Sequence, residues 1–147
     1  MSGYTIESLA QQELAALTKG VWLGSGGSRH VYRMRYNEQR VVKIAQSSVW
    51  ANVEERNTWE AVRGTEVERW FACVHSLTDL GVVLIQDYVP DLPCGVYRIP
   101  AFLTDLKRSN FGIGVYKGEP QVVCRDYGLH LLREIGMSKK LIRWEAT

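Results

Sequence analysis

The sequence predicts an α+β fold, in which a small antiparallel sheet is followed by one long helix. Three short segments rich in β-branched and aromatic residues come early in the chain, at 21–23, 31–36 and 40–45. A long stretch from about Val49 to His75 then repeats apolar residues at intervals of three and four, which is the spacing of a helix face. An apolar run at 81–86 predicts one more strand.

The connections between these elements have their own signals. Residues from about Thr5 to Thr18 carry an apolar stripe that predicts an amphipathic helix ended by Gly20. The short segment 37–39 predicts a tight turn between two strands, and Gly64 predicts a break or kink in the long helix.

The second half of the chain predicts one more hairpin, formed by strands at 115–116 and 121–125 around the turn residues 117–120. This hairpin delivers Asp126 at the end of a strand. Such a placement suits a metal ligand, because the strand is rigid and the next residue is free to turn.

Composition limits the range of functions. At 147 residues and 46% hydrophobic content the chain is expected to form a single domain over residues 1–147, burying about two-thirds of its unfolded surface. No run approaches the roughly 20 apolar residues of a membrane span, and no secretory signal is visible, so a cytoplasmic protein without membrane contact is expected. The net charge of +2, from 18 basic and 16 acidic residues, does not predict nucleic-acid binding.

The cysteines and histidines lack the spacing of a known metal or disulfide motif. Cys73, Cys94 and Cys124 are odd in number and widely separated, which predicts reduced thiols. The three histidines show no ligand spacing either. Any metal is therefore expected to bind through oxygen atoms.

Two segments carry residues that suit phosphoryl transfer, Asp105-Leu106-Lys107-Arg108-Ser109-Asn110 and Asp126-Tyr127-Gly128. This reaction needs an acid–base carboxylate, oxygen ligands for Mg²⁺ and cations for the phosphates. Their order resembles the catalytic loop D-L-K-x-x-N and the metal loop D-[F/Y]-G of the protein kinase-like superfamily.

The cluster from Gly24 to Tyr32 resembles a kinase glycine-rich loop. Gly24, Gly26 and Gly27 would let backbone N–H groups approach phosphate oxygens, and Val31 would cover the adenine. An ordinary hairpin turn is the alternative explanation. Where the family usually has a third glycine, this chain has Arg29.

The segment Arg40-Val41-Val42-Lys43-Ile44-Ala45 resembles the V-A-I-K strand of the family. Strand alternation points Lys43 to the face opposite Val42, which would be the nucleotide cleft; a solvent-facing lysine is the alternative. The family pairs this lysine with a helix carboxylate. Glu55 is favoured, because Trp59 lies one turn beyond it on the same face. Glu54 and Glu60 remain open.

The resemblance implies a minimal kinase-like fold that contains an N-lobe antiparallel sheet with one long helix and a severely reduced C-lobe. The implied ranges are 1–20 for an N-terminal helix, 21–90 for the N-lobe and 91–147 for the C-lobe. Between Pro90 and Asp105 there is room for about one short helix, ending at Phe102-Leu103. The A-P-E motif is absent, and Leu103-Thr104 replaces the usual His-Arg pair. A looser similarity is to short kinase-like proteins of phage and bacteria.

The resemblance also implies roles for individual residues. Lys43 would neutralise the α- and β-phosphates of ATP while Glu55 orients it, and backbone groups near Asp87 and Val89 would meet the adenine edge. In the other loops, Asp126 and Asn110 would bind Mg²⁺, Lys107 would steady the γ-phosphate and Asp105 would act as the base.

Two functions follow from this resemblance. One is a small ATP- and Mg²⁺-dependent phosphotransferase of the serine/threonine kinase-like type, which acts on itself, another protein or a small molecule. The other is a catalytically impaired kinase-like module that binds a protein partner or a second copy of the chain. An exposed Trp50 or Trp144 in an apolar patch would favour the second.

Overall fold

The computed structural model of the protein describes residues 14–26, 28–127, 130 and 132–147. The chain divides into two compact units. The first contains Met1–Arg56 and Cys73–Tyr88, and the second contains Asn57–Ala72 and Val89–Thr147.

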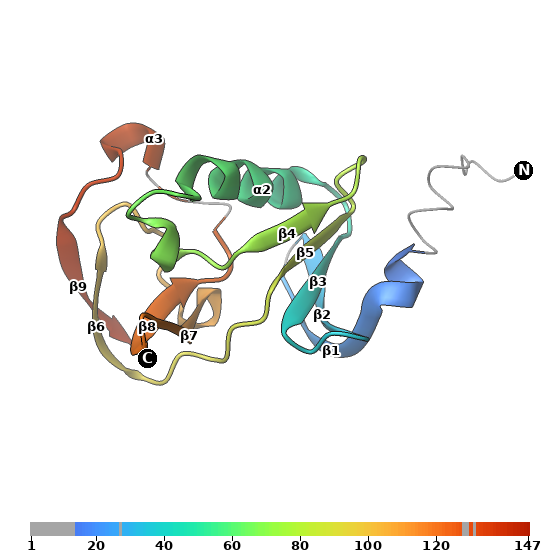
Figure 1. Ribbon diagram of the computed structural model, residues 1–147, viewed down its shortest axis with the longest axis horizontal. Helices are drawn as coiled ribbons and strands as arrows, with labels where there is room; N and C mark the ends of the chain where they lie inside the picture. The colour runs from blue at the N-terminus through green and yellow to red at the C-terminus, as the bar shows by residue number, and fades with distance from the viewer. Residues whose placement is uncertain (1–13, 27, 128–129, 131) are drawn as a thin grey trace, which may run out of the picture. The chain divides into compact units, whose positions relative to one another are not determined.

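The first unit is built on a five-stranded sheet with the order β1-β2-β3-β5-β4, in which every neighbouring pair is antiparallel (Figure 1). This confirms the α+β class and the antiparallel sheet. The strands are β1 (Lys19–Ser25), β2 (Arg29–Met34), β3 (Arg40–Ala45), β4 (Val74–Leu77) and β5 (Val83–Asp87). The predicted helix at 5–18 is described only at 14–18, where it is helical; the rest lies outside the described residues.

The helix after β3 is α2, and it is shorter than predicted. It spans Trp50–Val62, beginning in the first unit and ending in the second. Gly64 adopts a φ of +77°, the left-handed conformation that ends many helices, and the Thr65 hydroxyl donates to the Val62 carbonyl at 2.6 Å. The break at Gly64 is therefore confirmed, whereas the helical prediction beyond residue 62 is wrong.

The residues predicted to continue the helix form other structure. Glu68–Trp70 is a 3₁₀ helix, η1, and β4 follows at Val74–Leu77. Trp70, Phe71 and Val74 are all buried, although they belong to different parts of the structure. Their spacing of three and four therefore does not come from one helix. Buried residues of a 3₁₀ helix and a strand thus gave the same apolar spacing as a continuous α-helix would.

The second unit contains two antiparallel pairs of strands, of which one is a hairpin (Figure 1). They are β6 (Gly95–Pro100) with β9 (Leu141–Ala146), and β7 (Phe111–Tyr116) with β8 (Glu119–Cys124), both antiparallel. The β7–β8 turn has Lys117 at φ +50° and Gly118 at φ +81°, as a type I′ turn requires. The predicted hairpin is confirmed, with longer strands. The remaining elements are η2 (Arg108–Asn110) and α3 (Leu132–Ile135).

The segment before Phe102 differs from the prediction. A short helix was expected to end at Phe102-Leu103, but β6 occupies Gly95–Pro100 and pairs along its whole length with β9. The partner strand is far away in sequence, so this pairing leaves no signal in the local pattern. The helical prediction was therefore wrong.

Aromatic residues form the core of the second unit. Phe71 stacks on Phe102 at a centroid distance of 6.0 Å and meets Tyr127 edge-on at 4.9 Å. Phe111 packs against Trp144 at 4.8 Å. The Tyr127 hydroxyl donates to the Ala72 carbonyl at 2.8 Å, which satisfies its polar group in the buried interior. This core includes Phe111, which directly follows the candidate catalytic loop, and Tyr127, which directly follows Asp126.

None of the helices in the described part of the chain has the length and apolar character that crossing a membrane requires.

Candidate functional site

The first unit contains the ion pair predicted between strand and helix. Lys43 lies in the middle of β3, flanked in register by Val31 of β2 and Leu84 of β5. Its ammonium Nζ lies 2.7 Å from Glu55 Oε1 on α2, and the two residues are 4% and 0% exposed. The solvent-facing alternative for Lys43 is excluded. Among the three glutamates considered, the structure places Glu55 in the pair.

The other two glutamates lie elsewhere on α2. Glu60 forms an exposed ion pair with Arg63 at 3.5 Å, one turn along the helix. Glu54 is partly exposed, whereas Glu55 and Trp59 are both buried. Because these two are four residues apart, they share the apolar face of the helix, which is why Trp59 indicated the correct glutamate.

Arg29 joins the same carboxylate. Its Nη2 donates to Glu55 Oε2, and its Nη1 donates to Asn52 Oδ1 at 3.2 Å. Arg29 is 5% exposed at the start of β2. The residue that replaces the family's third glycine therefore packs its guanidinium inward against α2.

Two buried amides complete the network. Gln86 Nε2 of β5 donates to Glu55 Oε1 at 3.3 Å. Asn52 Nδ2 donates to the carbonyls of Lys43 at 3.2 Å, Gly81 at 3.0 Å and Val82 at 3.1 Å. The Asn52 side chain thereby connects the start of α2 to backbone carbonyls of β3 and of the segment just before β5.

The carboxylate of Glu55 therefore accepts from an ammonium, a guanidinium and an amide in a site closed to solvent. Burying charges costs several kcal/mol for each ion, and only close pairing with further hydrogen bonds offsets that cost. The arrangement holds the Lys43 amine in one position. Such fixed placement of a cation is what binding of a polyphosphate would use.

The glycine cluster forms the turn between β1 and β2. Gly24 pairs with Val31, Ser25 pairs with His30, and the Gly26 N–H donates to the Arg29 carbonyl at 2.9 Å. Gly27 lies outside the described residues. A Cβ added at Gly24 or Gly26 would meet no described atom within 4 Å, so packing in the described chain does not require glycine there. The hairpin-turn explanation is confirmed as geometry, and the open space beside it is compatible with a ligand.

The predicted adenine contacts are partly occupied by the protein itself. The Asp87 N–H donates to the Cys73 carbonyl at 2.8 Å. The Val89 carbonyl accepts from Arg125 Nη1, also at 2.8 Å. The Asp87 N–H and the Val89 carbonyl are therefore already engaged within the protein.

In the second unit, the segment from Asp105 to Asn110 forms a tight loop. Asn110 Nδ2 donates to the backbone carbonyl of Asp105 at 2.8 Å and to its Oδ2 at 3.0 Å. Asp105 has a φ of +52°, in the left-handed region that costs most residues about 1–2 kcal/mol but that Asp and Asn tolerate best. The buried Asn110 amide thus holds a strained backbone and an exposed carboxylate in one geometry.

Asp126 is fastened to the same loop. The carbonyl of Asn110 accepts the N–H groups of Arg125 at 2.9 Å and Asp126 at 3.3 Å. Asp126 is exposed two residues beyond β8, and the next residue, Tyr127, is fully buried. Asn110 therefore contacts both Asp105 and the backbone of Asp126 within the second unit.

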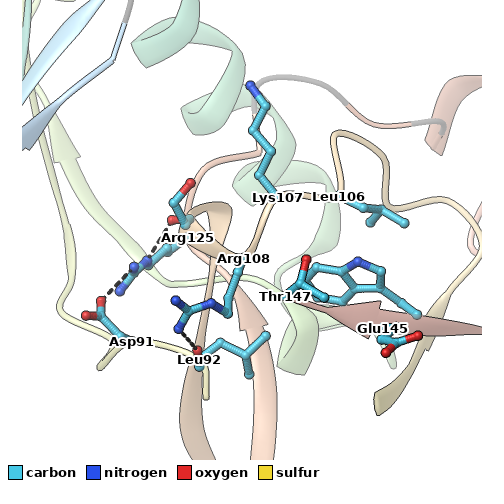
Figure 2. Close-up of a pocket in the computed structure, with 10 residues that line it drawn as sticks. Asp91, Leu92, Leu106, Lys107, Arg108, Arg125, Glu145 and Thr147 are labelled. Carbon is cyan, nitrogen blue, oxygen red and sulfur yellow. Dashed lines mark hydrogen bonds and ion pairs between the residues drawn. The ribbon is translucent and has the colours of Figure 1, made fainter. Parts of the chain in front are cut away.

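Lys107 lies beside this group. Its Nζ is 3.7 Å from Asp105 Oδ1, and its side chain is largely exposed. Figure 2 shows Lys107 extending away from Arg108 and Arg125, which dashed lines tie to other residues. Arg108 Nη1 donates to the Leu92 carbonyl at 2.9 Å, and Arg125 Nη2 pairs with Asp91 at 2.8 Å. Lys107 therefore has an exposed, positively charged side chain that can reorient toward a bound ligand.

A cavity of about 570 Å³ adjoins the loop (Figure 2). Its wall contains Lys107, Arg108 and Arg125 together with the acids Asp91 and Glu145. Mixed charge of this kind suits a small polar molecule or a peptide segment. Asp105, Asn110 and Asp126 are not among the residues of its wall.

We expect Asn110→Ala to loosen the loop. The change removes both hydrogen bonds to Asp105 and should lower the free energy of unfolding by about 1–3 kcal/mol. Urea unfolding measures the loss, and amide hydrogen exchange at 105–110 should become faster. Ser109→Ala is the matched control, because that side chain is exposed, and its effect should stay within about 0.5 kcal/mol. Equal effects of both changes would contradict the bracing role of Asn110.

Sequence reasoning missed Asn52 and Gln86 as members of the buried network and did not assign Arg29 to it. A signal was present for Asn52, which lies three residues before Glu55 and so shares its helix face. Gln86 is the last residue of an apolar run, and a polar side chain in a buried strand needs a hydrogen-bond partner. Arg29 was noticed only as a departure from a glycine pattern.

Comparison with known proteins adds no assignment. A scan of the chain against protein-family models gives no match. A search of curated proteins also gives none.

Proposed function

We propose that the protein is a small ATP- and Mg²⁺-dependent phosphotransferase with a reduced kinase-like fold. The observation that carries the proposal is the cluster of Asp105, Asn110 and Asp126. The buried side-chain amide of Asn110 donates to the Asp105 backbone and carboxylate, and the backbone carbonyl of Asn110 accepts the Asp126 N–H. Phosphoryl transfer needs positioned carboxylates more than covalent chemistry, and this cluster supplies them.

Within the loop, each residue has a distinct role. Asp126 and the amide oxygen of Asn110 bind Mg²⁺, since carboxylate and amide oxygens are ligands that this ion accepts. The Asn110 NH₂ group donates to Asp105, which turns the amide oxygen away from that residue. Lys107 neutralises the γ-phosphate, and Asp105 accepts the proton of the attacking hydroxyl.

In the first unit, Lys43 binds the α- and β-phosphates while Glu55 orients it. The backbone near Gly24 contacts phosphate oxygens, and Val31 contacts the adenine; the Gly26 N–H is already bound to the Arg29 carbonyl, and Gly27 lies outside the described residues. The open space at Gly24 and Gly26 supports this role. The Asp87 carbonyl binds the adenine edge, and in the second unit the Val89 N–H is the further group that the resemblance assigns to adenine. ATP and Mg²⁺ are the cofactors of this proposal.

A second candidate function is a kinase-like module that binds nucleotide and a protein partner without turnover. Trp22 and Trp50 favour it, because they are 58% and 52% exposed, whereas Trp144 is buried. Val21 and Leu23 on either side of Trp22 are exposed as well. Exposed tryptophans are frequent anchors of protein interfaces.

Calorimetric titration with ATP and Mg²⁺ tests the nucleotide site. Lys43→Ala and Asp126→Asn should each weaken binding at least about tenfold, a loss of about 1.4 kcal/mol. If both residues serve one nucleotide, the double variant should lose less than the sum of the two single losses, because coupled residues are not additive.

Lys140→Ala and Asp79→Asn are the controls, since they make the same charge changes at exposed positions. They should leave the affinity unchanged. Strictly additive losses in the double variant would argue that Lys43 and Asp126 do not share a ligand. Full affinity in both single variants would reject the site. Binding without transfer of label from γ-labelled ATP would favour the binding module.

A further inference from the structure

Three potential metal ligands converge in the first unit, and one of them, Asp87, was given only a backbone contact with the nucleotide. The ligand atoms of Cys73, His75 and Asp87 all lie within 4.8 Å of one another. Cys73 immediately precedes β4, His75 lies within it, and Asp87 is the last residue of β5. The only role given to Asp87 above concerns its backbone carbonyl, so its side chain is available for a different one.

The sheet explains why these side chains meet. β4 and β5 are antiparallel neighbours, with Val74 opposite Gln86, so Cys73 lies opposite Asp87. Side chains of directly opposed residues, and of residues two apart on one strand, share a face of the sheet. A bulge between Val74 and Ser76 falls at His75 and adjusts the direction of its ring.

The donor set is that of a borderline transition metal. One thiolate, one imidazole and one carboxylate are ligands of Zn²⁺, which binds sulfur at about 2.3 Å and nitrogen or oxygen at about 2.0–2.2 Å. Mg²⁺ and Ca²⁺ prefer oxygen alone, so a thiol and an imidazole together disfavour them. Three protein ligands leave one position of a tetrahedron for water or an added ligand.

The present separations are close to what a metal needs. Tetrahedral bonds of these lengths place ligand atoms about 3.3–3.8 Å apart. His75 Nε2 and Asp87 Oδ1 are 2.5 Å apart, joined by a hydrogen bond that a metal would replace. The side chains of His75 and Asp87 are 28% and 46% exposed, so small rotations and entry of an ion from solvent are both open to them.

We propose that Cys73, His75 and Asp87 form a site for one Zn²⁺-class ion on the edge strand of the sheet. The ion fastens β4 to the end of β5 through side chains, beside the backbone hydrogen bond from Asp87 to Cys73. Binding releases the thiol proton and any proton held between His75 and Asp87. Asp87 contributes only its backbone to the proposed nucleotide site, so titration with a metal ion in the absence of ATP tests the metal site separately.

Co²⁺ titration of the whole chain tests the proposal. The intact protein should take up one Co²⁺ with tetrahedral d–d absorption and with a sulfur-to-cobalt charge-transfer band, and Zn²⁺ should displace it. Cys73→Ser should abolish the charge-transfer band. His75→Ala and Asp87→Asn should each weaken binding more than about 10–100-fold, the loss seen when a residue that only orients a ligand is removed.

Cys94→Ser is the matched control, because Cys94 is an exposed cysteine of the second unit. It should keep the full spectrum and affinity. Failure of the intact chain to bind Co²⁺ or Zn²⁺ would overturn the site. A charge-transfer band that survives Cys73→Ser, or disappears in Cys94→Ser, would also overturn it. If Cys73→Ser does not fold, the variant Asp87→Asn decides, because that side chain is partly exposed. Unchanged affinity for Co²⁺ in Asp87→Asn would then overturn the proposal.

Discussion

Glu55→Ala is expected to lower the free energy of unfolding by about 3–5 kcal/mol, the loss typical of removing one member of a buried ion pair. The carboxylate accepts from Lys43, Arg29 and Gln86 in a site with no solvent exposure. Without it, two cations keep their desolvation cost and lose the group that offsets it. Urea unfolding followed by circular dichroism measures the change.

Glu60→Ala provides the comparison on the same helix. That carboxylate is half-exposed and pairs with Arg63 at 3.5 Å, so its removal should cost no more than about 1 kcal/mol. If the two variants lost similar stability, the buried network would not be a stabilising centre of the first unit. Glu55→Gln should fall between them, because the amide keeps the shape of the side chain but not its charge.

Asp105→Asn is expected to reduce transfer of the γ-phosphoryl group by about 100- to 10,000-fold, the usual contribution of a positioned acid–base group. Asparagine tolerates the φ of +52° at this position and still offers an oxygen to the Asn110 amide. The substitution therefore removes the base while leaving the loop in place. Initial rates with γ-labelled ATP and Mg²⁺ give the ratio.

Affinity for ATP and Mg²⁺ separates the base from a general binding role. It should be unchanged in Asp105→Asn, since Asp126 and Asn110 bind the metal in the proposal. Asp105→Gly is a second variant that also accepts the backbone conformation and should be equally inactive. Undiminished transfer by both variants would remove Asp105 from the mechanism.

The pairing of Lys43 with a helix carboxylate was implied by the resemblance, whereas the direction of Lys43 and the choice of Glu55 could be predicted from local pattern. Strand alternation gives the direction of Lys43, and the spacing of Glu55 and Trp59 gives the buried face of the helix. Gly64 likewise ends α2 through its own backbone conformation. These features depend on residues no more than a few positions apart.

Other features could not be predicted in this way. The pairing of β6 with β9 joins residues 95–100 to residues 141–146, and no local feature of either segment indicates which strand it will pair with. The same holds for Arg29, whose guanidinium reaches Asn52 and Glu55 on α2. In the second unit, the left-handed conformation of Asp105 depends on the buried amide of Asn110.

The amino-acid sequence by itself determined the α+β class, the strands around Lys43, the turn at Lys117-Gly118 and the residue types of the candidate site. Only the tertiary structure decided that Arg29 and Gln86 share the carboxylate of Glu55, and that Cys73, His75 and Asp87 meet across two strands. The reason is physical. Local periodicity and turn chemistry are set by neighbouring residues, whereas contacts between distant segments depend on which arrangement of the whole chain buries its apolar surface and satisfies its buried polar groups.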